Sequence, residues 1–195
     1  MKIYNNKQGT QEWLLARLGK LTASDAYTIS VNGKGLETLC LKKVSEILTN
    51  KIDDGYKSEA MINGNNLEAE ARNAYELETG ETVNQVGFCE LDYMTGASPD
   101  GFLGEDGLIE IKCKTDTVFV KDLLGSEIDT EHYYQMQMQM LVTGRKYCSY
   151  VVYNPNFKKS LIIKRLDRDE VAIEKIKAGI ETGKAMIKTM MEKLK

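Results

Sequence analysis

The 195-residue sequence has very little histidine, proline and cysteine, with 1 His, 2 Pro and 4 Cys. The cysteines Cys40, Cys89, Cys113 and Cys148 form no CxxC pair and have no histidine at zinc-ligand spacing. We therefore expect free, buried thiols in a reducing compartment, with no disulfide, zinc or iron–sulfur framework. The one histidine, His132, has no obvious partner in the sequence, which argues against a Ser-His or Cys-His nucleophile. We expect it to be an ordinary polar residue of a helix.

Long apolar runs are also missing. No stretch approaches the roughly 20 consecutive apolar residues of a membrane-spanning helix, and the N-terminal residues MKIYNNKQGTQEW lack the apolar core of a signal peptide. We expect a cytoplasmic protein with no membrane partner. The composition, 42% hydrophobic and 28% charged, is that of a globular protein, and the length favours a single domain over residues 1–195.

Acidic residues concentrate in the middle of the chain and basic residues at its end. Residues 53–110 contain 14 acidic and 2 basic residues, whereas residues 158–195 contain 11 basic and 6 acidic residues. This pattern fits a cation site beside a surface that tolerates phosphate, but solvated faces of charged helices explain it equally well. The net charge of −3 does not attract DNA as a whole, so any DNA must approach through local basic patches.

Hydrophobic periodicity and turn residues predict a mixed order of helices and strands. Helices are expected over residues 10–17, 22–30, 36–49, 67–78, 116–125 and 131–142, and from 168 onward. Strands are expected over residues 83–91, 96–98, 108–113, 147–154 and 160–165. This order favours one α/β domain with a mixed sheet.

Two helical segments carry patterns with more than one explanation. In 131–142 the methionines of the run QMQMQM are expected to fill the core, and residues 135 and 139 share one helical face. In the last helix, apolar residues at 3–4 spacing form either an internal packing seam or an oligomer contact.

The segment that carries chemistry begins at Ser98-Pro99-Asp100-Gly101 and continues nine residues after Asp100 with Glu110-Ile111-Lys112. In a strand, Glu110 and Lys112 project to one face while the neighbouring isoleucines point to the other. A Gly-rich turn can fold Asp100 back beside Glu110. Two converging carboxylates suit Mg2+, and a lysine beside them suits phosphodiester hydrolysis. A solvated acidic hairpin remains the alternative on spacing alone.

Four other side chains could complete such a site. Glu68 could lend a third carboxylate, although an exposed ion pair with Arg72 is the alternative. Arg17 and Ser24 could hold a terminal phosphate, or they could be a surface arginine and a helix cap. Gln135 could orient a water or phosphate, or it could be solvated.

Together these residues resemble the PD-(D/E)xK nuclease superfamily, and more closely its YqaJ-like viral recombinase group, which includes phage lambda exonuclease. Five motifs carry the resemblance in order: Trp13-x3-Arg17-Leu18-Gly19-Lys20-Leu21-Thr22-Ala23-Ser24; Gly64-x3-Glu68-x2-Ala71-Arg72; Ser98-Pro99-Asp100-Gly101; Glu110-Ile111-Lys112-Cys113; and Tyr134-Gln135-Met136-Gln137 followed by Thr143-Gly144. The resemblance implies a single restriction-endonuclease-like α/β domain, with a central mixed β-sheet flanked by helices.

The resemblance also implies an activity and its partners. The expected enzyme is a metal-dependent 5′→3′ exonuclease that digests one strand of linear double-stranded DNA with a 5′-phosphate and leaves a 3′ overhang. Two Mg2+ ions would be the cofactor, and Mn2+ would substitute. The overhang would pass to a single-strand annealing protein of a phage recombination system. A homotrimer is also implied.

Site residues are carried over position by position. Asp100 and Glu110 would bind metal together with the backbone carbonyl of Ile111, and Glu68 would support the second ion. Catalysis would further use Lys112, which acts on the attacking water, and Gln135, which positions it; Arg17 and Ser24 would bind the 5′-phosphate.

Two segments, 31–60 and 116–130, contain no motif. We consider two roles for them: a wedge that splits the duplex, and contacts between subunits. Two rival functions also remain. A PD-(D/E)xK endonuclease would use the same metal site without needing a DNA end. A non-catalytic DNA-binding assembly module would keep the fold alone, although it would gain nothing from clustered carboxylates.

Overall fold

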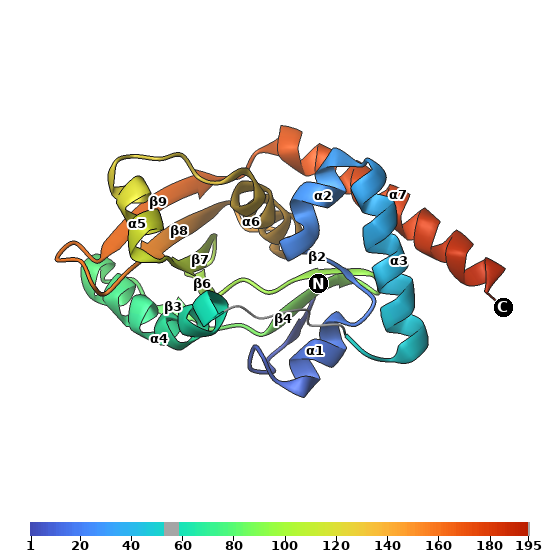
Figure 1. Cartoon of the computed structure of the whole chain (residues 1–195), viewed down its shortest axis with the longest axis horizontal. Coiled ribbons are helices and arrows are strands. Elements are labelled where there is room, and N and C mark those ends of the chain that lie inside the picture. Colours follow the sequence, from blue (N-terminus) through green and yellow to red (C-terminus); the bar gives the residue numbers. More distant parts are fainter. Residues whose placement is uncertain (53–58, 195) are drawn as a thin grey trace.

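The structure is a computed structural model that describes residues 1–52 and 59–194, and of residues 59–66 the backbone alone. Part of the unassigned segment 31–60, residues 53–58, therefore lies outside the described residues. Helices pack with mixed sheets in an α/β fold, which confirms the expected fold class (Figure 1). No helix in the described ranges is long and apolar enough to cross a membrane.

The strands form two mixed sheets where the sequence predicted one. The larger has the order β3-β6-β7-β8-β9, with β7 and β8 parallel and the other pairs antiparallel. Its strands are β3 (Val83–Asn84), β6 (Gly101–Leu103), β7 (Gly107–Cys113), β8 (Tyr147–Tyr153) and β9 (Leu161–Asp167). The smaller has the order β1-β4-β5-β2, made of β1 (Lys2–Tyr4), β4 (Phe88–Asp92), β5 (Thr95–Ala97) and β2 (Leu21–Thr22).

The division of the sheet explains why the predicted strand 83–91 is wrong. Its first residues form β3 in the larger sheet and its last residues form β4 in the smaller one. Between them, Gly87 packs against the N-terminal segment so closely that a Cβ would lie 2.2 Å from the carbonyl oxygen of Asn6. Only glycine allows this approach, and the chain changes sheet at this point. Strand β1 was not predicted, because three residues carry no periodicity and form a strand only by pairing with β4.

Helices cover both sheets (Figure 1), and the buried side chains form three clusters, one with the smaller sheet and one on each face of the larger sheet. The helices are α1 (Gln11–Arg17), a 3-10 turn at Ala23–Asp25, α2 (Ala26–Val31), α3 (Lys34–Thr49), α4 (Glu59–Thr79), α5 (Asp116–Leu123), α6 (Thr130–Thr143) and α7 (Glu170–Lys193). Helix α4, which begins earlier than predicted, packs on one face of the larger sheet. Helices α5 and α6 cover the other face.

Helix α6 lies between the cluster of the smaller sheet and the cluster of the larger sheet that includes α5. Met136 and Met140 pack toward β7, β8 and α5, whereas Met138 packs with α2, α3 and α7. All three methionines are fully buried, which confirms their role as core residues. The glutamines that alternate with these methionines are held in fixed directions as a result, and the site described below uses Gln135 and Gln139.

The last helix forms an internal seam. Its buried residues pack on α2, α3 and β2, and a Cβ on Gly179 would lie only 1.9 Å from the carbonyl oxygen of Ile29. The close approach of α7 and α2 thus requires a residue without a side chain. Leu194 continues the 3–4 spacing of apolar residues in this helix but is 62% exposed, because the seam ends before it.

Candidate active site

The turn before β6 brings Asp100 to β7. The Asp100 N–H donates to the carbonyl of Ile109 at 3.2 Å, and its Oδ2 accepts the N–H of Ile111 at 2.7 Å. The antiparallel pairing of β6 and β7 sets this register. Asp100 therefore lies beside the strand that carries Glu110, as the sequence predicted.

Glu110 is held from three directions on the face of β7 that α6 covers. It is 2% exposed. Gln135 Nε2 donates to Oε1 at 2.7 Å, and Gln139 Nε2 donates to Oε2 at 2.6 Å. Lys112 Nζ lies 2.7 Å from Oε1 and 3.4 Å from Gln135 Oε1. The structure thus joins Glu110, Lys112 and Gln135 and adds Gln139, which the sequence reasoning missed as a site residue.

The electrostatics of these groups are those of a cation site. The pKa of Asp100 is raised well above its ordinary value by burial and by the negative charges of Glu110 and Glu68. Burial lowers the pKa of Lys112, but the Glu110 and Asp100 carboxylates outweigh it and raise that pKa overall. Lys112 is therefore an ammonium ion at neutral pH.

Glu68 is near this site but is not gathered into it. Its charge acts on Asp100, yet its Oε1 accepts a 2.6 Å bond from Arg72, the ion pair considered as its alternative. Among the described side chains, those of residues 1–52 and 67–194, no group of three or more His, Cys, Asp or Glu could hold a metal ion. The two-carboxylate set of Asp100 and Glu110 nevertheless fits a hard divalent cation, because mutually repelling oxygen ligands are what such an ion neutralises.

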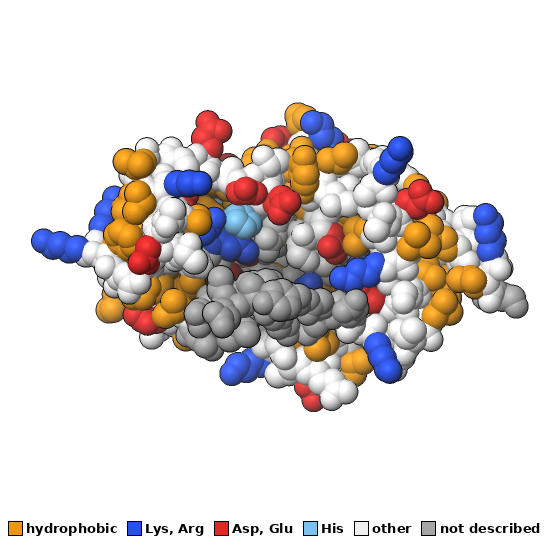
Figure 2. Space-filling model, viewed as in Figure 1, with side chains coloured by type: hydrophobic (Ala, Val, Ile, Leu, Met, Phe, Trp, Pro, Cys, Tyr) orange, Lys and Arg blue, Asp and Glu red, His pale blue; other side chains and the backbone are white. Residues whose placement is uncertain are grey.

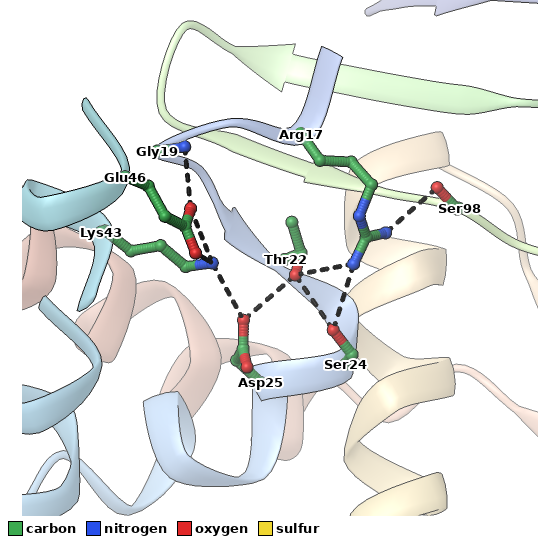
Figure 3. Close-up of polar contacts among 8 residues, drawn as sticks. All are labelled: Arg17, Gly19, Thr22, Ser24, Asp25, Lys43, Glu46 and Ser98. Carbon is green, nitrogen blue, oxygen red and sulfur yellow. Dashed lines mark hydrogen bonds and ion pairs between the residues drawn. The ribbon is translucent and has the colours of Figure 1, made fainter. Parts of the chain in front are cut away.

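A second candidate site lies around Arg17, at the end of α1 (Figure 3). The guanidinium stacks over the Trp13 ring at 4.4 Å and donates to Ser98 Oγ at 3.3 Å and to Ser24 Oγ at 3.4 Å. A pocket of about 160 Å³ opens here, lined by Trp13, Leu14, Arg17, Thr22, Ser24, Asp25, Lys42, Lys43, Glu46 and Ile52. The structure thus brings Arg17 and Ser24 together in a concave polar site. Ser98, two residues before Asp100, connects this pocket to the carboxylates along the chain.

The face drawn in Figure 2 shows acidic and basic side chains interspersed, with the histidine next to basic residues. The sequence suggested no partner for His132, but the structure shows one. Its Nδ1 lies 3.0 Å from the Tyr150 hydroxyl. Burial, followed by the charges of Lys112 and Lys114, lowers the pKa of His132 to about 4.

This shift predicts a pH-dependent stability. His132 is protonated near its ordinary pKa in the unfolded chain, but only at lower pH in the folded chain. Its contribution to the free energy of unfolding is therefore complete above about pH 6.5 and is lost as the pH falls toward 4. Allowing for partial exposure, we expect a loss of about 2 kcal/mol in the free energy of unfolding. Urea denaturation at pH 7.5 and 5.0 measures it. His132→Gln should flatten this part of the profile, and an unchanged slope in that variant would assign the loss to other groups.

Comparisons with known proteins agree with this arrangement. The profile of the YqaJ-like viral recombinase domain matches residues 12–146. The crystal structure of an alkaline exonuclease, LHK-Exo, from Laribacter hongkongensis is similar at 33% identity and a TM-score of 0.88, over 95% of this chain and 96% of that one. The structure of LHK-Exo in complex with dAMP matches equally well.

A phage related exonuclease from Haemophilus somnus shares the fold at 14% identity and a TM-score of 0.70, over 90% of this chain and 96% of that one. No curated protein sequence gives a significant match. The family profile covers most of the chain, and LHK-Exo is more than 30% identical over nearly all of it. The chain therefore belongs to the family of YqaJ-like viral recombinase domains.

Proposed function

We propose that this chain is a metal-dependent 5′→3′ exonuclease, a single catalytic domain over residues 1–195 that digests one strand of linear double-stranded DNA and leaves a 3′ overhang. The observation that carries the proposal is a cluster of polar side chains around β7. Asp100, which precedes β6, accepts from the N–H of Ile111, while Glu110 and Lys112 of β7 contact each other and the glutamines of α6. Membership of the recombinase family and the likeness to an alkaline exonuclease support it.

Asp100, Glu110 and the backbone carbonyl of Ile111 are the groups that would hold a divalent cation, with Glu68 supporting a second one. Mg2+ is the proposed ion and Mn2+ a substitute, because all these ligands are oxygens. When bound, the cation supplies positive charge that polarises the scissile phosphate. The pKa of Asp100, raised by burial and by Glu110 and Glu68, supports this role, because a bound cation would offset the negative charges that surround this carboxyl.

Lys112 and Gln135 act on the attacking water. Lys112 carries a positive charge beside Glu110, so it holds negative charge that develops on the water or on the phosphate. Gln135 touches both Glu110 and Lys112, and its amide fixes their mutual orientation. The precise placement of these groups, rather than a covalent intermediate, would account for the rate.

The 5′-phosphate of the strand being digested would occupy the pocket around Arg17 and Ser24. Arginine presents a planar fork of donors that matches phosphate oxygens, and the Ser24 hydroxyl lies 3.4 Å from the guanidinium. Each hydrolysed nucleotide exposes a new 5′-phosphate for the same pocket, which gives the reaction its direction.

The expected cellular context belongs to the proposal as well. The 3′ overhang would pass to a single-strand annealing protein in the cytoplasm of a bacterial host. A homotrimer would allow the enzyme to surround its DNA. Segments 31–60 and 116–130, which contain α3 and α5, are available for the wedge and for subunit contacts.

Replacing Arg17 with alanine should reduce the preference for 5′-phosphorylated ends by about 10- to 100-fold, because a bidentate charged partner of the phosphate is lost. The measurement is the ratio of kcat/KM on 5′-phosphoryl and 5′-hydroxyl duplexes. Arg165→Ala, which removes an exposed arginine paired with Asp167, is the control and should leave the ratio unchanged. An Arg17→Ala ratio equal to that of the unmodified chain would exclude the pocket as the phosphate site.

The activity itself is tested with three substrates, each with Mg2+ and with EDTA: linear 5′-phosphorylated duplex, linear 5′-hydroxyl duplex and covalently closed circle. Mg2+-dependent loss of linear DNA, fastest with the 5′-phosphate and absent on the circle, is the expected result. Cutting of the circle would identify an endonuclease. No cutting of any substrate would favour a binding module.

A further inference from the structure

Helix α3 contributes two buried, charged side chains to the lining of the Arg17 pocket. Lys43 is 7% exposed and Glu46 is 3% exposed. The Lys43 ammonium lies 3.2 Å and 3.4 Å from the two Glu46 oxygens, and 3.9 Å from Asp25 Oδ2. Burying such charges is costly unless each has partners, so their presence on a helix that could carry apolar residues there calls for a reason beyond stability.

The buried pair is connected to the turn that presents Arg17 (Figure 3). Glu46 Oε2 accepts the N–H of Gly19 at 3.0 Å. Gly19 has φ +70°, and a Cβ there would lie 2.5 Å from Ile47 Cγ1, so the turn rests directly on α3. The anchor lies two residues after Arg17.

A second branch passes through Asp25. Its Oδ2 accepts the Thr22 hydroxyl at 3.1 Å, and Thr22 Oγ1 in turn accepts from Arg17 Nη2 at 3.5 Å and lies 3.0 Å from Ser24 Oγ. Lys43 therefore contacts both carboxylates of a network that ends on the two side chains proposed to hold phosphate.

The charge of the pocket gives this arrangement a function. Asp25 and Glu46 both line the cavity, and a terminal phosphate carries about −1.5 to −2 at neutral pH. Two carboxylates would repel such a group. Among the described residues that line the pocket, Lys43 is the cation that lies within 4.0 Å of both carboxylates.

We propose that Lys43 is a specificity-determining residue for 5′-phosphorylated DNA ends. It pairs with both Asp25 and Glu46 and offsets one of their two negative charges, so that the pocket accepts a dianionic phosphate. The inference rests on the proposed role of the Arg17 pocket. It assigns to α3, which carries none of the five sequence motifs, the charge balance of that pocket.

The test measures binding in EDTA, where no cleavage occurs, by fluorescence anisotropy of labelled linear duplexes with 5′-phosphate or 5′-hydroxyl ends. Lys43→Met should lower the ratio of the two affinities by about tenfold, because a charge in a partly screened pocket is lost. Lys43→Arg should retain the ratio. Lys34→Met, at an exposed lysine of the same helix, is the matched control and should also retain it.

A role in folding alone would lower binding to both ends equally and would leave their ratio unchanged, which would overturn the proposal. The double variant Lys43→Met with Asp25→Asn separates neutralisation from direct contact. Removal of one of the two repelling carboxylates restores the net charge of the group and should recover most of the preference, since asparagine still accepts from Thr22. A preference lost in Lys43→Met and not recovered in the double variant would also overturn the neutralising role.

Failure of the proposed function is distinguishable from failure of this inference. If the unmodified chain itself bound both ends equally, the phosphate pocket would be wrong and Lys43 would have no preference to determine. If the unmodified chain and Lys43→Met showed the same clear preference, the pocket would stand and the role of Lys43 would be rejected.

Discussion

Replacing Asp100 with asparagine is expected to reduce DNA cleavage by at least about a thousandfold, because one of the two carboxylates that would hold the cation is lost. The same change should raise the free energy of unfolding in metal-free buffer at neutral pH. Burial and the charges of Glu110 and Glu68 raise the pKa of Asp100, so its ionised form destabilises the folded chain above the ordinary pKa of a carboxyl. Asparagine removes that charge and still accepts the N–H of Ile111.

Three measurements check this prediction: single-turnover cleavage in Mg2+, thermal unfolding with Mg2+ and with EDTA, and DNA binding in EDTA. In the unmodified chain Mg2+ should raise the Tm, because an ion that binds only the folded state stabilises it. Asp100→Asn should lose most of that rise while binding DNA as before.

Asp106→Asn is the control, since Asp106 lies in the turn of the same hairpin, is half-exposed and pairs with Lys146. It should change neither cleavage nor the Mg2+ response. Turnover by Asp100→Asn close to that of the unmodified chain would remove Asp100 from the metal site.

The core of the candidate site could be predicted from the sequence because it depends on local rules. The alternation of side chains along a strand put Glu110 and Lys112 on one face, and the turn before β6 returned Asp100 to that strand. Helical spacing likewise placed residues 135 and 139 together. Gln139 was still missed as a site residue, because nothing in the sequence says that α6 lies over Glu110.

Features that depend on long-range packing could not be predicted. Lysine and glutamate are usually exposed, and Lys43 and Glu46 become buried partners through the approach of Gly19 and Asp25 to α3. The division of the sheet at Gly87 depends on contact with the N-terminal segment, which is more than 80 residues distant in sequence. Both cases show tertiary contacts overriding a local pattern.

Replacing Gln139 is the second change from which we expect a large effect on cleavage. Its amide donates to Glu110 Oε2 at 2.6 Å, it is fully buried, and its own Oε1 has no hydrogen-bond partner. A buried glutamine with one unpaired polar atom lowers the stability of the folded chain. Its hydrogen bond to Glu110 is the favourable contact that it makes at this position. Groups that orient a metal ligand change affinity or activity by about 10- to 100-fold when they are removed.

Gln139→Met keeps the length of the side chain and leaves Glu110 Oε2 without its donor. We expect the Mg2+ concentration for half-maximal cleavage to rise and the rate at saturating Mg2+ to fall by about 10- to 100-fold. The KM for DNA should change little, because Gln139 is buried and does not reach the substrate. Gln139→Glu should be worse, since it places a second carboxylate against Glu110.

Gln137→Met is the matched control, because it is the same substitution at a fully buried glutamine of the same helix. Gln137 donates to the Asp167 carbonyl and accepts the N–H of Asp169, so its loss should lower stability without changing the Mg2+ requirement. Direct Mn2+ binding, followed by calorimetry without DNA, gives a readout independent of turnover. Weaker Mn2+ binding in Gln139→Met but not in Gln137→Met would show that α6 positions Glu110 for the ion, whereas equal binding in both would leave Gln139 as a packing residue.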